Sequence, residues 1–172
     1  MRKLAIIIAC ICMFNLVGCT NNVTAGVSLL EEKKYEEAKN AFQKEIDHGK
    51  RLGEAYHGLG IACFELGEYE NAKTAFETAL KNKEKESAVL YSFLGACSIE
   101  LSEYEDALKY YKKALSMDEL TEKQEQEVRF NLIAVYEFMG DWESAKKQMD
   151  QYEKQYPNDD RIEKEADFLE TR

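Results

Sequence analysis

The side chains in this sequence best suited to metal binding or nucleophilic catalysis are its two histidines and five cysteines. Zinc sites need several such ligands at short, fixed spacings, and the sequence has no His-x-x-x-His, His-Glu-x-x-His or Cys-x-x-Cys motif. It also lacks a Gly-x-Ser-x-Gly elbow and a phosphate-binding glycine loop. His48 stands near the expected end of a helix, where a cation is mildly favourable. The sequence therefore predicts no catalytic residue, no metal site and no cofactor.

The first residues have the layout of an export signal. Arg2 and Lys3 precede an apolar stretch from Leu4 to Phe14, which is too short to span a bilayer comfortably as a helix. The stretch leads into Leu16-Val17-Gly18-Cys19, a run that resembles the lipobox of bacterial lipoproteins. The resemblance implies cleavage before Cys19, lipid attachment to its thiol and acylation of the new amino terminus.

These implications divide the start of the chain into a signal peptide, residues 1–18, and a lipid-anchored tether, residues 19–23. The mature protein would be extracytoplasmic, with acyl chains such as palmitate in the membrane. It would lie on the outer face of the cell membrane, or on the outer membrane in a double-membraned bacterium. Two alternatives remain open: an ordinary secretory signal with a chance cysteine, and an uncleaved anchor.

Composition limits the partners and the number of domains. The 172 residues are 45% hydrophobic, which is enough to bury the core of a single domain. The formal net charge is −10 at pH 7. Nucleic-acid binding depends on clustered lysine and arginine, so this acidic balance excludes it.

A helical pattern recurs four times along the rest of the chain. Each copy has an aromatic residue, an alanine three positions later and an apolar residue four positions after that: Tyr35, Ala38 and Phe42; Tyr69, Ala72 and Phe76; Tyr104, Ala107 and Tyr111; Trp142, Ala145 and Met149. The leading aromatic residues are 34, 35 and 38 positions apart. In the central copy a first helix precedes this pattern, and Gly67 supplies the turn between the two helices. The pattern resembles the tetratricopeptide repeat family, whose unit is a helix–turn–helix of about 34 residues.

The resemblance implies an all-α fold, a right-handed α-solenoid of about four helix–turn–helix repeats plus a C-terminal capping helix. The repeats are expected at about 24–49, 52–84, 86–119 and 121–157, together 24–157, and the capping helix at 158–172. Thr121 and Gln124 form a capping-box signal that starts the first helix of the fourth repeat. Cys63 and Cys97 fall on the first helices of adjacent repeats, where buried thiols are favoured over a disulfide.

The first helix of each repeat carries a second stripe of residues, which packing within the hairpin does not explain. Its residues, at helical spacing, are Val27 and Leu30; His57, Ile61 and Phe64; Ser92, Ala96 and Ile99; and Phe130, Ala134 and Glu137. In the family this face lines a concave groove that holds partner peptides or helices. With Glu65 and Glu100 nearby, it would suit a protein or peptide segment that is apolar and somewhat basic. The alternative is that superhelical curvature or the neighbouring hairpins already cover the stripe.

The sequence thus favours a lipid-anchored, non-catalytic scaffold for protein–protein contact. By analogy, such a scaffold would assemble envelope or secretion machinery. The alternative is a ligand-binding or sensory lipoprotein whose groove takes a small molecule or a glycan. Sugar sites stack on exposed aromatic rings, for which Phe64, Phe130 and Phe138 are the candidates.

Overall fold

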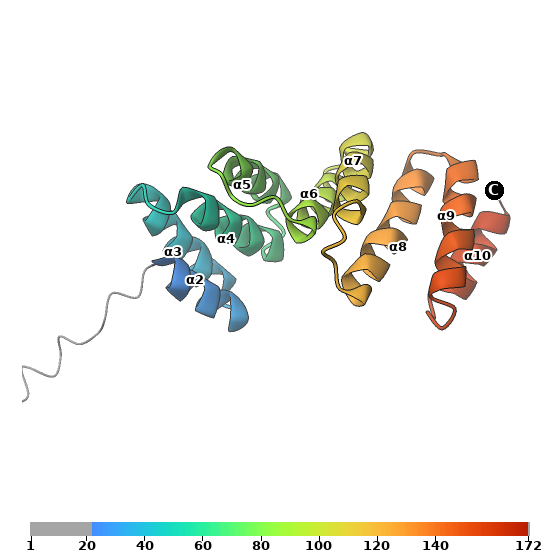
Figure 1. The fold of residues 1–172 in the computed structure, drawn as a ribbon, viewed down its shortest axis with the longest axis horizontal. Coiled ribbons are helices and arrows are strands. Elements are labelled where there is room, and N and C mark those ends of the chain that lie inside the picture. The colour runs from blue at the N-terminus through green and yellow to red at the C-terminus, as the bar shows by residue number, and fades with distance from the viewer. Residues whose placement is uncertain (1–21, 172) are drawn as a thin grey trace, which may run out of the picture.

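The computed structural model describes residues 22–171, so the predicted signal peptide and Cys19 lie outside the described residues. Every regular element within them is an α-helix. The helices follow one another along the long axis of the molecule as four hairpins and a terminal helix (Figure 1). Their bounds are α2 Asn22–Glu31, α3 Tyr35–Asp47, α4 Leu52–Glu65, α5 Tyr69–Lys81, α6 Ala88–Glu100, α7 Tyr104–Leu115, α8 Glu122–Phe138, α9 Trp142–Gln155 and α10 Ile162–Glu170. The predicted α-solenoid is confirmed.

In each of the first three hairpins, a glycine on the first helix faces an aromatic residue of the second helix. A Cβ on Gly60 of α4 would stand 2.6 Å from Cε1 of Phe76 in α5, closer than two carbon atoms can approach. The Phe76 side chain is fully buried by this contact and its neighbours. The same contact recurs between Gly26 and Phe42 and between Gly95 and Tyr111. The absent side chain lets the two helices approach closely enough to enclose the ring.

The turn inside each hairpin has one repeated conformation. Its second residue has a positive φ in all four hairpins: 58° at Lys33, 76° at Gly67, 61° at Ser102 and 72° at Gly140. The N–H of the next residue donates to a carbonyl of the preceding helix, as from Glu68 N to Cys63 O over 2.9 Å. The predicted turn at Gly67 is confirmed. Because the turns are alike, successive hairpins present the same faces.

The hydrophobic core runs the length of the array. A smaller cluster in the first hairpins includes Ala38, Phe42 and Ala62, and a larger one extends from Cys63 to Leu169. Leu59 packs against both clusters, which makes the core continuous. No single hairpin could bury its apolar faces alone, so the stack is the folding unit.

Cys63 and Cys97 are free thiols in this core, exposed over only 2% and 0% of their surfaces. Burial raises the pKa of the Cys63 thiol to about 11 and that of the Cys97 thiol to about 12. Both thiols stay protonated near neutral pH and are unreactive as nucleophiles. The expectation of buried thiols is confirmed.

The ends of the array differ in detail from the sequence-based boundaries. Helix α2 begins at Asn22, inside the segment 19–23 that the sequence assigned to the tether. Helix α8 begins at Glu122 with the predicted capping box, in which Thr121 and Gln124 satisfy each other's backbone N–H groups.

Within residues 22–171, no helix combines the length and apolar character needed to cross a lipid bilayer.

Candidate interaction groove

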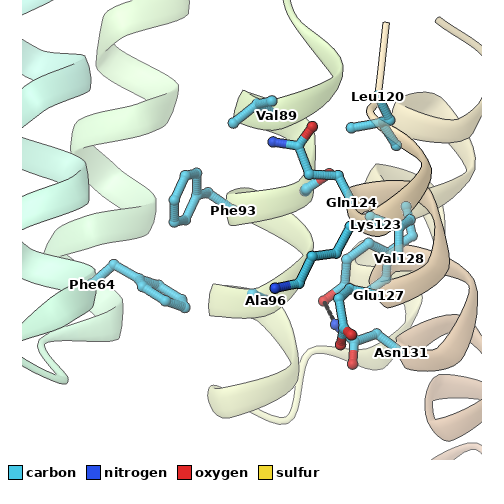
Figure 2. A pocket seen from close by; sticks show the side chains of 12 residues that line it. Phe64, Val89, Phe93, Ala96, Leu120, Lys123, Gln124, Glu127, Val128 and Asn131 are labelled. Atoms are coloured by element: carbon cyan, nitrogen blue, oxygen red, sulfur yellow. Dashed lines mark hydrogen bonds between the residues drawn. The ribbon is translucent and has the colours of Figure 1, made fainter. Parts of the chain in front are cut away.

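A largely apolar cavity lies between the first helices α4, α6 and α8. We call it the first-helix cavity; its volume is about 300 Å³. Figure 2 shows Phe64 and Phe93 on one side of it and the side chains of α8 on the other. Its lining residues are Phe64, Val89, Ser92, Phe93, Ala96, Tyr111, Leu120, Lys123, Gln124, Glu127, Val128 and Asn131.

The aromatic wall of the cavity is anchored in the hairpin core. Phe93 of α6 meets Phe64 of α4 edge to face, with ring centroids 5.2 Å apart, and stacks on buried Phe76 at 5.4 Å. Such pairs stabilise by about 0.5–1.5 kcal/mol beyond the area they bury. The wall is therefore fixed before anything enters the cavity.

Polar groups lie at the floor and along one edge. At the floor, the amide of Asn131 donates to the Tyr111 hydroxyl over 3.4 Å, and burial raises the pKa of that hydroxyl well above its usual range. At the edge, the Lys123 side chain extends from α8 towards Ala96 of α6 (Figure 2). Glu127 on the same edge accepts a hydrogen bond from Arg161 over 2.9 Å. The cavity thus offers an apolar interior with charges of both signs at its edge.

Three residues of the predicted stripe line this cavity: Phe64, Ser92 and Ala96.

The other apolar residues of the stripe lie outside the cavity. Ile61 and Ile99 are on the same helices, partly buried against the core. Ala134 is half-buried on α8. At the N-terminal end, Leu30 packs partly on the smaller core cluster, whereas Val27 is 45% exposed. The stripe therefore follows the helical spacing from repeat to repeat, but only its middle part lines a cavity.

Phe130 is covered by the C-terminal segment. The Arg161 guanidinium lies over its ring, 4.1 Å from the centroid, and Tyr152 of α9 packs against it edge to face at 5.5 Å. Arg161 is held there by Asp159, whose Oδ2 accepts from the guanidinium over 2.7 Å. At Phe130 the stripe is therefore covered by a neighbouring segment, which was the alternative to an open groove.

The two ionisable members of the stripe also have partners. His57 Nδ1 lies 3.3 Å from Glu84 Oε1, and its ring packs edge to face on Phe76. Glu137 is half-buried near the end of α8 and faces Glu165 of α10. Neither residue lines the first-helix cavity. Among the described residues, no three histidine, cysteine or acidic side chains form a group that could hold a metal ion.

Most of the cavity's lining was missed by the sequence analysis, although the signal for it was present. Val89, Phe93 and Ala96 follow the i, i+4, i+7 spacing on α6, as do Gln124, Val128 and Asn131 on α8. The predicted stripe on α8 starts at Phe130, further along the helix. Because α8 begins a turn early, its N-terminal half reaches the cavity instead.

Comparisons with known proteins agree with this architecture. Tetratricopeptide repeat models match residues 53–85 and 98–164. A TPR repeat-containing protein of Bacillus subtilis, YsoA, is 37% identical over 59 residues. This match covers 34% of the present chain and only 18% of the length of YsoA.

Solved structures share the fold at low sequence identity. The TPR protein YrrB, described as having an unusual peptide-binding site, superposes with a TM-score of 0.75 at 22% identity, over 91% of this chain and 78% of YrrB. MamA gives a TM-score of 0.72 at 17% identity, over 84% of this chain and 81% of MamA. From its recurring hairpins and the matching family models, the chain belongs to the tetratricopeptide repeat family.

Proposed function

We propose that this protein is a lipid-anchored, extracytoplasmic scaffold that binds a segment of a partner protein in the first-helix cavity. The anchor rests on the lipobox-like run ending in Cys19 and the export signal before it. The fold is consistent with a binding role, since repeat proteins of this family are typically non-catalytic interaction scaffolds. Assembly of envelope or secretion machinery is the process we propose for it.

The cavity is the single observation that carries the binding role. About 300 Å³ of largely apolar space suits one or two apolar side chains of a bound segment. Its aromatic wall is rigid, so binding would not have to order it. The peptide-binding site named for YrrB supports the same use of the fold here.

Charge around the cavity supports a partner that is apolar and somewhat basic. Glu65 and Glu100 are exposed on the first helices that border it. In the lining itself, Lys123 and Glu127 carry one charge of each sign, and Glu127 is paired with Arg161. The net charge of −10 would also attract a basic segment at long range. We therefore propose an apolar anchor side chain flanked by lysine or arginine.

Site-specific photocrosslinking in intact cells tests this function. A benzophenone amino acid replaces Ala96, which lines the cavity, or Thr74, which is exposed on α5, in the full-length chain. We expect protein crosslinks from position 96 and few from position 74, with the crosslinked segment apolar and basic. Equal crosslinking at both positions would contradict the proposal.

A second candidate function is capture of a small molecule or glycan. The observation that favours it is the volume of the cavity, which lies at the lower end of the range for small-molecule sites, roughly 300–1,000 Å³. Phe64 and Phe93 would supply the ring faces for stacking. In the crosslinking experiment this function predicts no protein adduct at position 96, and a ligand retained by the purified protein.

A further inference from the structure

Two carboxyl groups meet where the last helix docks on the array. Glu137 in the last turn of α8 and Glu165 in the middle of α10 are both half-buried. Their carboxyl groups are close enough for a hydrogen bond, which requires that one of them carry a proton. The other carboxyl oxygen of Glu137, Oε1, is buried and has no hydrogen-bond partner.

The internal repeats show how unusual this contact is. Leu59 and Leu132 hold equivalent places in the first helices α4 and α8, so Glu137 is equivalent to Phe64. Phe64 contacts Phe93 of the next first helix through an aromatic pair 5.2 Å apart. Helix α10 follows α9 as α6 follows α5, and it packs on α9. A carboxyl pair thus replaces an apolar contact between successive first helices.

Within residues 22–171, no lysine or arginine forms an ion pair with Glu137 or Glu165. On α9 and α10, Lys146, Asp150, Glu153 and Glu170 line a separate groove that contains neither Glu137 nor Glu165. On α6, Glu100 is exposed, and on α10 itself Glu163, Lys164 and Asp167 are exposed. Among the described residues, Glu165 is the charged group that acts on the Glu137 carboxyl.

We propose that α10 is a proton-dependent cap, which docks on the array while the Glu137–Glu165 pair holds a proton and loosens when both carboxyls are ionised. Two carboxylates in a half-buried contact repel each other, and burial penalises both charges. The apolar hold on α10 is small: Leu169 is buried, and Ile162 and Ala166 pack only partly on the core.

Linkage gives the direction and the pH range of this switch. Burial and the neighbouring Glu165 raise the pKa of the Glu137 carboxyl to about 8. An undocked glutamate ionises near pH 4.3, so the docked state holds the extra proton between these values. Docking is therefore tightest below about pH 4, and it weakens as the pH rises towards 8.

Loosening of the cap would open the C-terminal end of the solenoid. Trp142 of α9 packs on Phe168 of α10, with ring centroids 6.2 Å apart, and Met149 lies in the groove between the same two helices. When α10 leaves, these apolar side chains become accessible. Near neutral pH and above, the end of the array could then accept another helix in its place.

The single tryptophan of the sequence is a reporter for this movement. Tryptophan emission of the full chain is recorded from pH 5 to 9, together with amide hydrogen exchange of residues 162–170. We expect the emission to shift to longer wavelength as the pH rises. We also expect the exchange of α10, corrected for its intrinsic pH dependence, to increase at least about tenfold.

Three variants make the test specific. Glu137→Gln and Glu165→Gln each remove one ionisable partner and keep a hydrogen-bonding side chain. Glu137→Gln should abolish the pH dependence and leave α10 docked, whereas Glu165→Gln should only weaken the pH dependence, because burial still raises the pKa of the Glu137 carboxyl. Glu163→Gln, at an exposed position of α10, should behave as the unmodified chain does. A transition that persists in Glu137→Gln, or a wild-type α10 whose exchange does not change between pH 5 and 9, would overturn the proposal.

Discussion

Phe76 and Phe93 stack across the boundary between the second and third hairpins, with ring centroids 5.4 Å apart and planes 21° from parallel. Phe76 is the buried aromatic residue of α5, and Phe93 lines the first-helix cavity. The packing inside one hairpin therefore fixes a wall of the candidate binding site. If the proposed binding site is correct, stability and binding are coupled through this pair.

Gly60→Ala should destabilise the fold. The new methyl group would stand 2.6 Å from the buried Phe76 ring, which cannot move without disturbing Phe93. Overpacking of this kind costs about 1–3 kcal/mol, partly offset by about 1 kcal/mol of helix propensity gained. We expect a net loss of order 1 kcal/mol by urea unfolding. Glu70→Ala, at an exposed position of α5, is the control. A Gly60→Ala variant as stable as the wild type would show that the contact between Gly60 and Phe76 has room for a methyl group.

Thr121→Ala should loosen the start of α8. The Thr121 side chain accepts from the backbone N–H of Gln124, and the Gln124 side chain accepts from the backbone N–H of Thr121 over 3.0 Å. Loss of such a cap costs about 0.5–2 kcal/mol. Hydrogen exchange in residues 122–126 should accelerate, whereas Ser116→Ala, which removes no N-terminal cap, should leave it unchanged. Equal exchange in the two variants would count against the capping role.

Acid should weaken the C-terminal clasp formed by Asp159 and Arg161. The Arg161 guanidinium holds the pKa of the Asp159 carboxyl well below its usual range. A lowered folded-state pKa stabilises the protein above the ordinary value of about 3.9, and that stability is lost as the pH falls below it. The melting temperature of the wild type should therefore exceed that of Asp159→Asn at pH 6, and the difference should shrink below about pH 4.

The control for this comparison is Asp160→Asn, because Asp160 is an exposed neighbour. Its melting temperature should follow the wild type at every pH. If the gap between the wild type and Asp159→Asn stays constant down to pH 2.5, the ion pair does not account for the stability of the clasp.

Cys19→Ser should release the protein from the membrane. In the proposed lipoprotein the lipid is attached to the Cys19 sulfur through a thioether bond. Serine has no sulfur and cannot form this bond. We expect the variant to lose incorporation of labelled palmitate and to leave the membrane fraction. Cys12→Ser, within the apolar segment, should keep both properties. Palmitate labelling that survives Cys19→Ser would remove the lipid anchor from the proposed function.

The repeat spacing in the sequence predicts the fold, because a fold of this kind depends on packing within each hairpin and between neighbouring hairpins. The spacing from Tyr69 to Phe76 places the aromatic ring of the second helix, and Gly60 and Gly67 mark the contact and the turn that enclose it. The spacing of the lead aromatic residue, the alanine and the apolar residue recurs in every hairpin, so an error in one copy does not change the assignment of the fold.

The site could be predicted only in part, because it depends on contacts between distant segments. The sequence stripe includes Phe64 and Ala96 but not Lys123. The capping box predicts where α8 begins, but it does not show that the first turn of α8 lies against the cavity. Phe130 has the right spacing for an open groove, yet Arg161 covers it after the chain turns back from α9. Helical spacing defines a face, but it does not show which side chain of a later segment lies on that face.

The affinity for the crosslinked partner segment tests the central claim most directly. The segment is made as a synthetic peptide, and its Kd is measured by calorimetry for the wild type, Ala96→Leu and Thr74→Leu. Ala96→Leu places three more carbon atoms in the first-helix cavity, whereas Thr74→Leu puts the same side chain at an exposed position of α5. We predict that Ala96→Leu weakens binding at least about tenfold, or about 1.4 kcal/mol, and that Thr74→Leu leaves it unchanged. Equal Kd values for all three proteins would contradict binding in the cavity.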